Sequence, residues 1–228
     1  MQKSIKILLS AILLTVLTSC ASHPTAPSLD MGSVQQKAES GDKHAQYQLA
    51  LLHRSYGHFP EALEWLQKAA AQDYPLAQNE LGNIYLEGRM EEEKDSNQAF
   101  AWYQKAAQGG YFDAINNLGY LYDLGKGTDQ DHAKAAQLYE LAASKGSIRA
   151  MYNLGLLYQQ GQGVEKDMVQ AYKWFDLARY YTGRSRDMSL KWAIRKQWDE
   201  LEATMSSSEK KEARELGTQW QKSIASNR

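Results

Sequence analysis

The chain has 228 residues, with 26 lysines and arginines against 27 aspartates and glutamates, and a formal net charge of −1. This balance argues against nucleic acid as a partner, because proteins that bind nucleic acid carry clustered positive charge. Cys20 is the one cysteine, so no disulfide can form within the chain.

The N-terminus has the pattern of a secretion signal. Lys3 and Lys6 form a basic region, and residues 5–17 form an apolar stretch that is short for a membrane span. A plain secretory signal would explain both features. We therefore expect residues 1–19 to be a signal peptide that is removed from the mature protein.

The end of this segment, Leu-Thr-Ser-Cys at residues 17–20, resembles a bacterial lipobox. The resemblance implies that Cys20 is lipidated and anchors the chain to a membrane. Ala21 in the next position resembles the signal for sorting to the outer membrane. The expected location is the bacterial cell envelope, with a lipid anchor in the outer membrane and the protein facing the periplasm. An accidental cysteine after an ordinary signal is the alternative.

Residues 20–33 are expected to be the lipidated cysteine followed by a flexible tether. Pro24 and Pro27 lie in this segment, and no apolar stripe of helical spacing runs through it. More than one acyl chain on Cys20 would be needed for firm attachment, because a single chain gives only marginal membrane binding.

Between residues 34 and 182 the sequence repeats. One series of small residues is spaced by 32, 37 and 36 residues: Ala45, Ala77, Ala114 and Ala150. A second is spaced by 37, 36 and 36: Ala62, Ala99, Ala135 and Ala171. A fixed period of this length is typical of a stack of similar units and not of one globular core.

Each unit is predicted to be a pair of helices. In the third unit Ala114, Leu118 and Tyr122 lie four residues apart on one helical stripe, and a glycine-rich break follows at residues 125–127. A second stripe begins at Ala135. Small residues at the repeated positions allow paired helices to approach closely, and we expect aromatic side chains such as Trp65, Trp102, Tyr139 and Trp174 to fill the space beside them.

These residues resemble the Sel-one-like repeats, which are relatives of the tetratricopeptide repeats. The fourth unit matches that pattern best, through Ala150, Leu154, Gly155, Tyr158, Gly161, Gly163, Val164, Asp167, Ala171, Trp174 and Ala178. The third unit has Thr128 in place of valine and Leu138 in place of tryptophan. The resemblance implies an all-α fold, a right-handed α-solenoid of about four helix-turn-helix repeats across residues 34–182, whose concave face binds protein.

Residues 183–228 are predicted to form two capping helices. Apolar residues recur at helical spacing in two series: Ile194, Trp198, Leu201 and Met205, then Ala213, Leu216, Trp220 and Ile224. Ser206 and Glu209 between them have the spacing of a capping box. A repeat stack needs such a terminal cap. The alternative is a helix pair that binds a partner through Trp192 or Trp220.

No catalytic, metal or cofactor motif is recognised. The histidines lack zinc-ligand spacing, and the glycine-rich segment at 125–128 lacks the upstream glycine of a phosphate-binding loop. Ser207 and Lys210 fit the Ser-x-x-Lys pattern of β-lactamase-like hydrolases, but no Ser-Asp-Asn or Lys-Thr-Gly accompanies them. The expectation is a protein that is not an enzyme, with a β-lactamase-like hydrolase as a distant alternative.

By analogy with tetratricopeptide geometry, the first helix of each unit lines a concave groove. The expected partner-binding residues are Tyr47, Leu51, Arg54, Asn79, Asn83, Asn116, Tyr120, Asp123, Arg149, Tyr152, Leu156 and Gln159. His44, Leu76, Leu86 and Asp113 occupy neighbouring positions of the same pattern.

Two functions fit these expectations. The first is a lipid-anchored envelope adaptor, a scaffold or regulator that binds a protein partner in the periplasm or at the cell surface. The second is a periplasmic immunity protein that neutralises a secreted antibacterial toxin, such as a type VI lipase effector, because some immunity proteins resemble this class.

Overall fold

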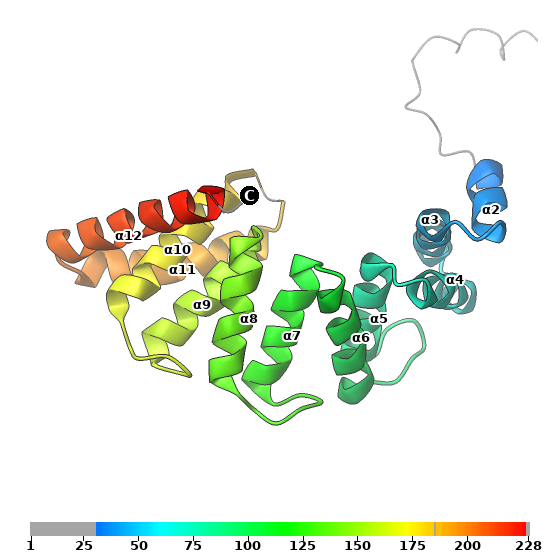
Figure 1. The fold of residues 1–228 in the computed structure, drawn as a ribbon, viewed down its shortest axis with the longest axis horizontal. Coiled ribbons are helices and arrows are strands. Elements are labelled where there is room, and N and C mark those ends of the chain that lie inside the picture. Colours follow the sequence, from blue (N-terminus) through cyan, green and yellow to red (C-terminus); the bar gives the residue numbers. More distant parts are fainter. Residues whose placement is uncertain (1–30, 185, 227–228) are drawn as a thin grey trace, which may run out of the picture.

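The computed structural model describes residues 31–184 and 186–226. In these residues the chain forms eleven α-helices and one short 3₁₀ helix, with no strand. The helices follow one another in a curved array, with α2 at one end and α11 and α12 at the other (Figure 1). Their bounds are α2 Met31–Glu39, α3 Lys43–Ser55, α4 Phe59–Ala71, α5 Pro75–Glu87, α6 Ser96–Gln108, α7 Phe112–Leu124, α8 His132–Ser144, α9 Ile148–Gln160, α10 Met168–Tyr181, η1 Thr182–Arg184, α11 Met188–Thr204 and α12 Ser207–Ser226.

Four helical hairpins form the body of the array: α3–α4, α5–α6, α7–α8 and α9–α10. The predicted all-α solenoid is therefore confirmed. A single hydrophobic cluster runs from the second hairpin to the capping helices, including Tyr85, Leu121, Trp174 and Ile194. Stacking each hairpin on the next buries a continuous core that no single hairpin could bury.

Turn chemistry explains where the hairpin helices begin and end. After α9, Gly161 has φ of +74° and closes the helix in the left-handed conformation that glycine adopts without strain. The side chain of Asp167 then accepts hydrogen bonds from the backbone N–H groups of Val169 and Gln170, which caps the start of α10. A Cβ at Gly163 would lie 2.2 Å from the carbonyl carbon of His132, so this turn packs directly on the preceding hairpin.

The two helices of a hairpin approach most closely where a glycine meets an aromatic ring. A Cβ on Gly155 would lie 2.6 Å from Cε1 of Phe175, and the equivalent pairs are Gly82 with Tyr103 and Gly119 with Tyr139. The rings beside these glycines are Tyr103, Tyr139 and Phe175. Of the aromatic residues expected in the core, Tyr139 and Trp174 are fully buried, while Trp65 and Trp102 are partly buried against the core.

The N-terminal boundary differs from the sequence prediction. The tether was expected to continue to residue 33, but α2 begins at Met31. Val34 and Ala38, one helical turn apart, are buried against Ala45 and Leu49 of the first hairpin. Cys20 and the signal peptide lie outside the described residues.

The two C-terminal helices cover the last hairpin, as predicted. Ile194 of α11 and Ala213 of α12 are fully buried, and the Trp220 ring stacks edge-on against Trp174 at 4.9 Å. The capping box forms, because the Ser206 N–H donates to Glu209 Oε2 at 2.8 Å. Trp192, in contrast, is 69% exposed.

None of the helices within residues 31–184 and 186–226 combines the length and the hydrophobicity that crossing a bilayer requires.

Candidate binding groove

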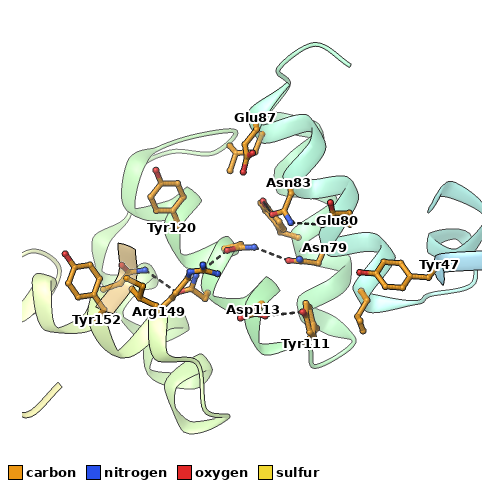
Figure 2. Close-up of a pocket in the computed structure, with 17 residues that line it drawn as sticks. Tyr47, Asn79, Glu80, Asn83, Glu87, Tyr111, Asp113, Tyr120, Arg149 and Tyr152 are labelled. Atoms are coloured by element: carbon orange, nitrogen blue, oxygen red, sulfur yellow. Dashed lines mark hydrogen bonds between the residues drawn. The ribbon is translucent and has the colours of Figure 1, made fainter. Parts of the chain in front are cut away.

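A groove of about 640 Å³ runs along the first helices of the second, third and fourth hairpins (Figure 2). Helix α5 contributes six of its residues and α7 contributes four, while α3, α6, α9, α11 and the turn before α7 complete the wall. The lining residues are Tyr47, Leu76, Asn79, Glu80, Asn83, Leu86, Glu87, Tyr103, Tyr111, Asp113, Asn116, Asn117, Tyr120, Arg149, Tyr152, Asn153 and Leu190.

Ten residues expected from the sequence line this groove. Seven belong to the main predicted set: Tyr47, Asn79, Asn83, Asn116, Tyr120, Arg149 and Tyr152. Leu76, Leu86 and Asp113, from neighbouring positions of the pattern, line it as well. The structure therefore brings these side chains together from four helices, although whether they bind a partner stays a prediction.

Other predicted residues lie outside the groove. Arg54 forms an ion pair with Glu80 at the groove edge, and Asp123 accepts a hydrogen bond from His132. Leu156 packs against the cluster formed by the capping helices. These three side chains do not line the groove, and whether they bind a partner stays a prediction. Leu51, Gln159 and His44 do not line it either.

The floor of the groove carries a relay of four asparagine side chains (Figure 2). Asn153 Nδ2 donates to Asn116 Oδ1 at 3.2 Å, and Asn116 Nδ2 donates to Asn117 Oδ1 at 3.3 Å. Asn117 Nδ2 then donates to Asn79 Oδ1 at 3.0 Å. The hydrogen bonds of the relay all run from α9 through α7 to α5. The relay therefore holds amide groups along the length of the floor.

The relay leaves hydrogen-bonding capacity unused. Each amide nitrogen carries two N–H groups, and the relay uses at most one of them. Asn79 and Asn116 both line the groove, although they are only 8% and 4% exposed. A side-chain amide offers the same donor and acceptor as a peptide bond, so such a floor matches the backbone of a bound chain.

A second polar network anchors the α5 side of the groove. The Tyr103 hydroxyl donates to Asn83 Oδ1 at 2.7 Å, and Asn83 Nδ2 donates to Glu80 Oε2 at 3.2 Å. Glu80 forms ion pairs with Arg54 and Arg89. These contacts fix the Glu80 and Asn83 side chains before any partner binds.

Three acidic residues and one basic residue line the groove, and their pairing is unequal. Glu80 has its two arginines, Glu87 pairs with Arg89 at 3.0 Å, and Arg149 pairs with Asp187 at 2.6 Å. Asp113 only accepts a hydrogen bond from the Tyr111 hydroxyl at 3.1 Å, and within the described residues it forms no ion pair.

Two tyrosines of the groove, Tyr47 and Tyr111, are held in their neutral form. Burial raises the pKa of Tyr47, and the Glu80 carboxylate raises it further. Burial also raises the pKa of Tyr111, with the Asp113 carboxylate as the next cause. Both hydroxyls therefore remain hydrogen-bond donors at neutral pH.

The sequence reasoning missed seven lining residues: Glu80, Glu87, Tyr103, Tyr111, Asn117, Asn153 and Leu190. Asn117 and Asn153 carried a usable signal, because they are equivalent to Glu80 at the repeat spacing and follow predicted residues by one position. Tyr103 comes from the second helix of its hairpin and reaches the groove beside Gly82. The prediction used only the first helix of each hairpin, so it could not find this residue.

Other polar clusters in the described part of the chain do not form a metal site. No group of three or more histidine, cysteine, aspartate or glutamate side chains is placed there to hold an ion. His53 and His58 have ring centroids 5.8 Å apart without further ligands from this set. Lys210, one half of the Ser-x-x-Lys pattern, donates to the Glu202 carbonyl oxygen at 3.0 Å.

Stacked helical hairpins with a polar concave groove define a repeat solenoid of the protein-interaction class. The Sel1 repeat model matches residues 43–74, 75–111, 112–147 and 148–180. These matches cover more than half of the chain, which therefore belongs to the Sel1 repeat family, and the predicted Sel-one-like resemblance is confirmed. The family supports a protein-interaction scaffold.

Solved structures agree with this assignment. A Sel1 repeat protein from Oxalobacter formigenes is 26% identical with a TM-score of 0.61, over 77% of this chain and 78% of that one. A protective antigen with an SLR fold from uropathogenic Escherichia coli is 27% identical with a TM-score of 0.51, over 86% of this chain and 49% of that one. No curated protein sequence matches the chain significantly.

An immunity protein from Pseudomonas aeruginosa is 18% identical with a TM-score of 0.47, over 90% of this chain and 83% of that one. A likeness this distant supports no inference about function. The immunity function therefore stays a prediction from the sequence.

Proposed function

We propose that this protein is a lipid-anchored adaptor of the bacterial envelope that holds an extended segment of a protein partner in the groove. The observation that supports this proposal is the asparagine relay on the groove floor. An extended segment has backbone N–H and C=O groups with no partners of their own, and each one buried without a hydrogen bond would cost free energy. The relay offers donors and acceptors along the line that such a segment would follow.

The groove is also prepared for binding before the partner arrives. Tyr120 and Tyr152 stand on the groove side of α7 and α9 (Figure 2). Tyrosine supplies a large contact area with few rotatable bonds and is common at the energetic centre of interfaces. The hydrogen-bonded amides, together with aromatic side chains that have few rotatable bonds, would lower the entropic cost of association.

The lipid anchor rests on the sequence pattern at residues 17–20 and on the apolar segment before it. An anchored adaptor would meet partners that share its membrane, so a modest affinity would suffice. Tethering raises the effective concentration without any new contact.

Photo-crosslinking from the groove tests the adaptor function. The full chain, produced in its own cells, would carry a benzophenone amino acid at Tyr120 or Tyr152. We expect one dominant protein adduct from both positions, identified by mass spectrometry. Asn97, an exposed asparagine of α6 outside the groove, provides the matched control position.

A variant of the groove floor tests whether the crosslinked adduct requires binding in the groove. Asn153→Ala removes one end of the relay at a half-buried position, and we expect it to lower the adduct yield severalfold while thermal unfolding stays cooperative. Equal adducts from Tyr120 and Asn97, or an adduct unaffected by Asn153→Ala, would show that the groove is not the binding surface.

A further inference from the structure

Among the described residues, one charged side chain that lines the groove has no oppositely charged side chain as a partner. Glu80, Glu87 and Arg149 each have an oppositely charged partner at the groove edge. Asp113 has the Tyr111 hydroxyl but no cation within the described residues. A bound segment would displace water from this half-buried carboxylate, and an unpaired charge in such a place is costly.

We propose that the groove selects segments that place a lysine or arginine on Asp113. This inference rests on the proposed function and names the chemistry of the partner. A cationic side chain would compensate the carboxylate as its water is lost. A neutral residue would leave it unpaired, and an acidic residue would add repulsion, so the site discriminates in both directions.

The neighbouring repeats place different side chains at the position of Asp113. Leu76, Asp113 and Arg149 occupy equivalent positions in the second, third and fourth hairpins, and all three line the groove. In Figure 2 Asp113 lies between Arg149 and Tyr111, below the amide relay. Arg149 is already paired with Asp187, so it does not compete for the carboxylate of Asp113.

The hydrogen bond between the second and third hairpins indicates where such a segment would lie. Asn117 of α7 donates to Asn79 of α5 at 3.0 Å, about one helical turn along from Asp113 and Leu76. A segment in the polyproline II conformation that lies over this bond would present a basic residue to Asp113 and an apolar residue to Leu76.

The same conformation explains the relay. A polyproline II segment makes no internal backbone hydrogen bonds, so its amide groups are available to the asparagine side chains. The charge at Asp113 and the amides on the floor would thus recognise one ligand, an extended protein segment that carries a basic residue.

A peptide selection tests this inference without assuming a sequence. The full chain in detergent micelles would be presented with a library of random nine-residue peptides, in parallel with Asp113→Asn, Asp113→Lys and Asn153→Ala. Asp129→Asn, at an exposed position in the turn before α8, is the matched control. Circular dichroism would confirm that each variant is folded.

We expect peptides retained by the unsubstituted chain to be enriched in lysine or arginine at one position. Asp113→Asn should abolish the basic preference, Asp113→Lys should replace it by an acidic one, and Asp129→Asn should leave it unchanged. A selected peptide should bind Asp113→Asn about tenfold more weakly, which corresponds to about 1.4 kcal/mol.

The outcomes separate the two proposals. If peptides depend on Asn153 but show no basic preference, or keep the preference in Asp113→Asn, the selection by Asp113 is refuted while the groove function stands. If no retained peptide depends on Asn153, both the groove function and the inference are refuted.

Discussion

Replacement of Lys173 by methionine should stabilise the protein. Lys173 lies on α10 and is only 9% exposed, with its ammonium 4.3 Å from the centre of the Trp174 ring. Burial lowers the pKa of this side chain from 10.5 to about 8, although the carboxylates of Glu140 and Asp167 oppose the change. The folded protein therefore carries a charge in a place that disfavours it.

The magnitude follows from the difference between the two pKa values. At pH 7 the lysine is protonated in both states, and the difference corresponds to a cost of about 3 kcal/mol in the folded state. Because the unfolded chain binds this proton more tightly, stability rises between about pH 8 and pH 10.5, and the cost falls to about 1 kcal/mol at pH 10. Lys173→Met keeps an unbranched side chain with a Cγ near Gly217, is one atom shorter, and removes the charge.

Urea unfolding at pH 7 and pH 10, followed by circular dichroism, measures this effect. We expect Lys173→Met to be stabilised by about 3 kcal/mol at pH 7 and by about 1 kcal/mol at pH 10. Lys134→Met is the control, since that ammonium lies 4.2 Å from the Tyr122 ring but is exposed. A gain for Lys173→Met that does not shrink at pH 10, or a loss at pH 7, would refute the argument from the buried charge.

Three further predictions concern packing, the groove edge and the anchor. Gly155→Ala would place a Cβ 2.6 Å from the Phe175 ring and should destabilise the fold by about 1–3 kcal/mol in thermal unfolding, whereas Gly183→Ala, with nothing within 4 Å, should have little effect. Glu80→Gln removes the partner of two arginines and should cost about 1–2 kcal/mol in urea unfolding; an unchanged midpoint would show that the ion pairs contribute nothing. Cys20→Ala should move the chain from the membrane fraction to the soluble fraction and remove the acyl mass from its N-terminal peptide, and membrane retention would refute the predicted anchor.

The repeat fold could be predicted because the equivalent buried positions of each unit have room only for a small side chain. Ala77, Ala114 and Ala150 are all fully buried at the helix contact, where a larger side chain would not fit. Helix α2 was missed for the opposite reason. Only Val34 and Ala38 of that helix are buried, and two apolar residues one turn apart are too weak a pattern to indicate a helix.

The groove could be predicted only where one repeat resembles the next. Transfer of a single pattern found Asn79, Asn116 and Tyr152, because the first helices of these units face the same space. The transfer failed at Leu156, since the fourth hairpin is the last one and the capping helices cover that position. It failed at Arg54 because a tertiary ion pair with Glu80 holds that side chain at the edge.

The positions that vary between repeats are the ones that can distinguish partners. The equivalent residues Leu76, Asp113 and Arg149 are apolar, acidic and basic, while the alanines one position after them are identical and buried. A stack that keeps its contacts constant presents these three different side chains from equivalent positions of consecutive hairpins. On the proposed function, we expect partners to be distinguished by the side chains that they place against these positions. Changing Asp113 alone should alter which segment binds without altering how the helices stack, because its side chain contacts only the Tyr111 hydroxyl among polar groups of the described chain.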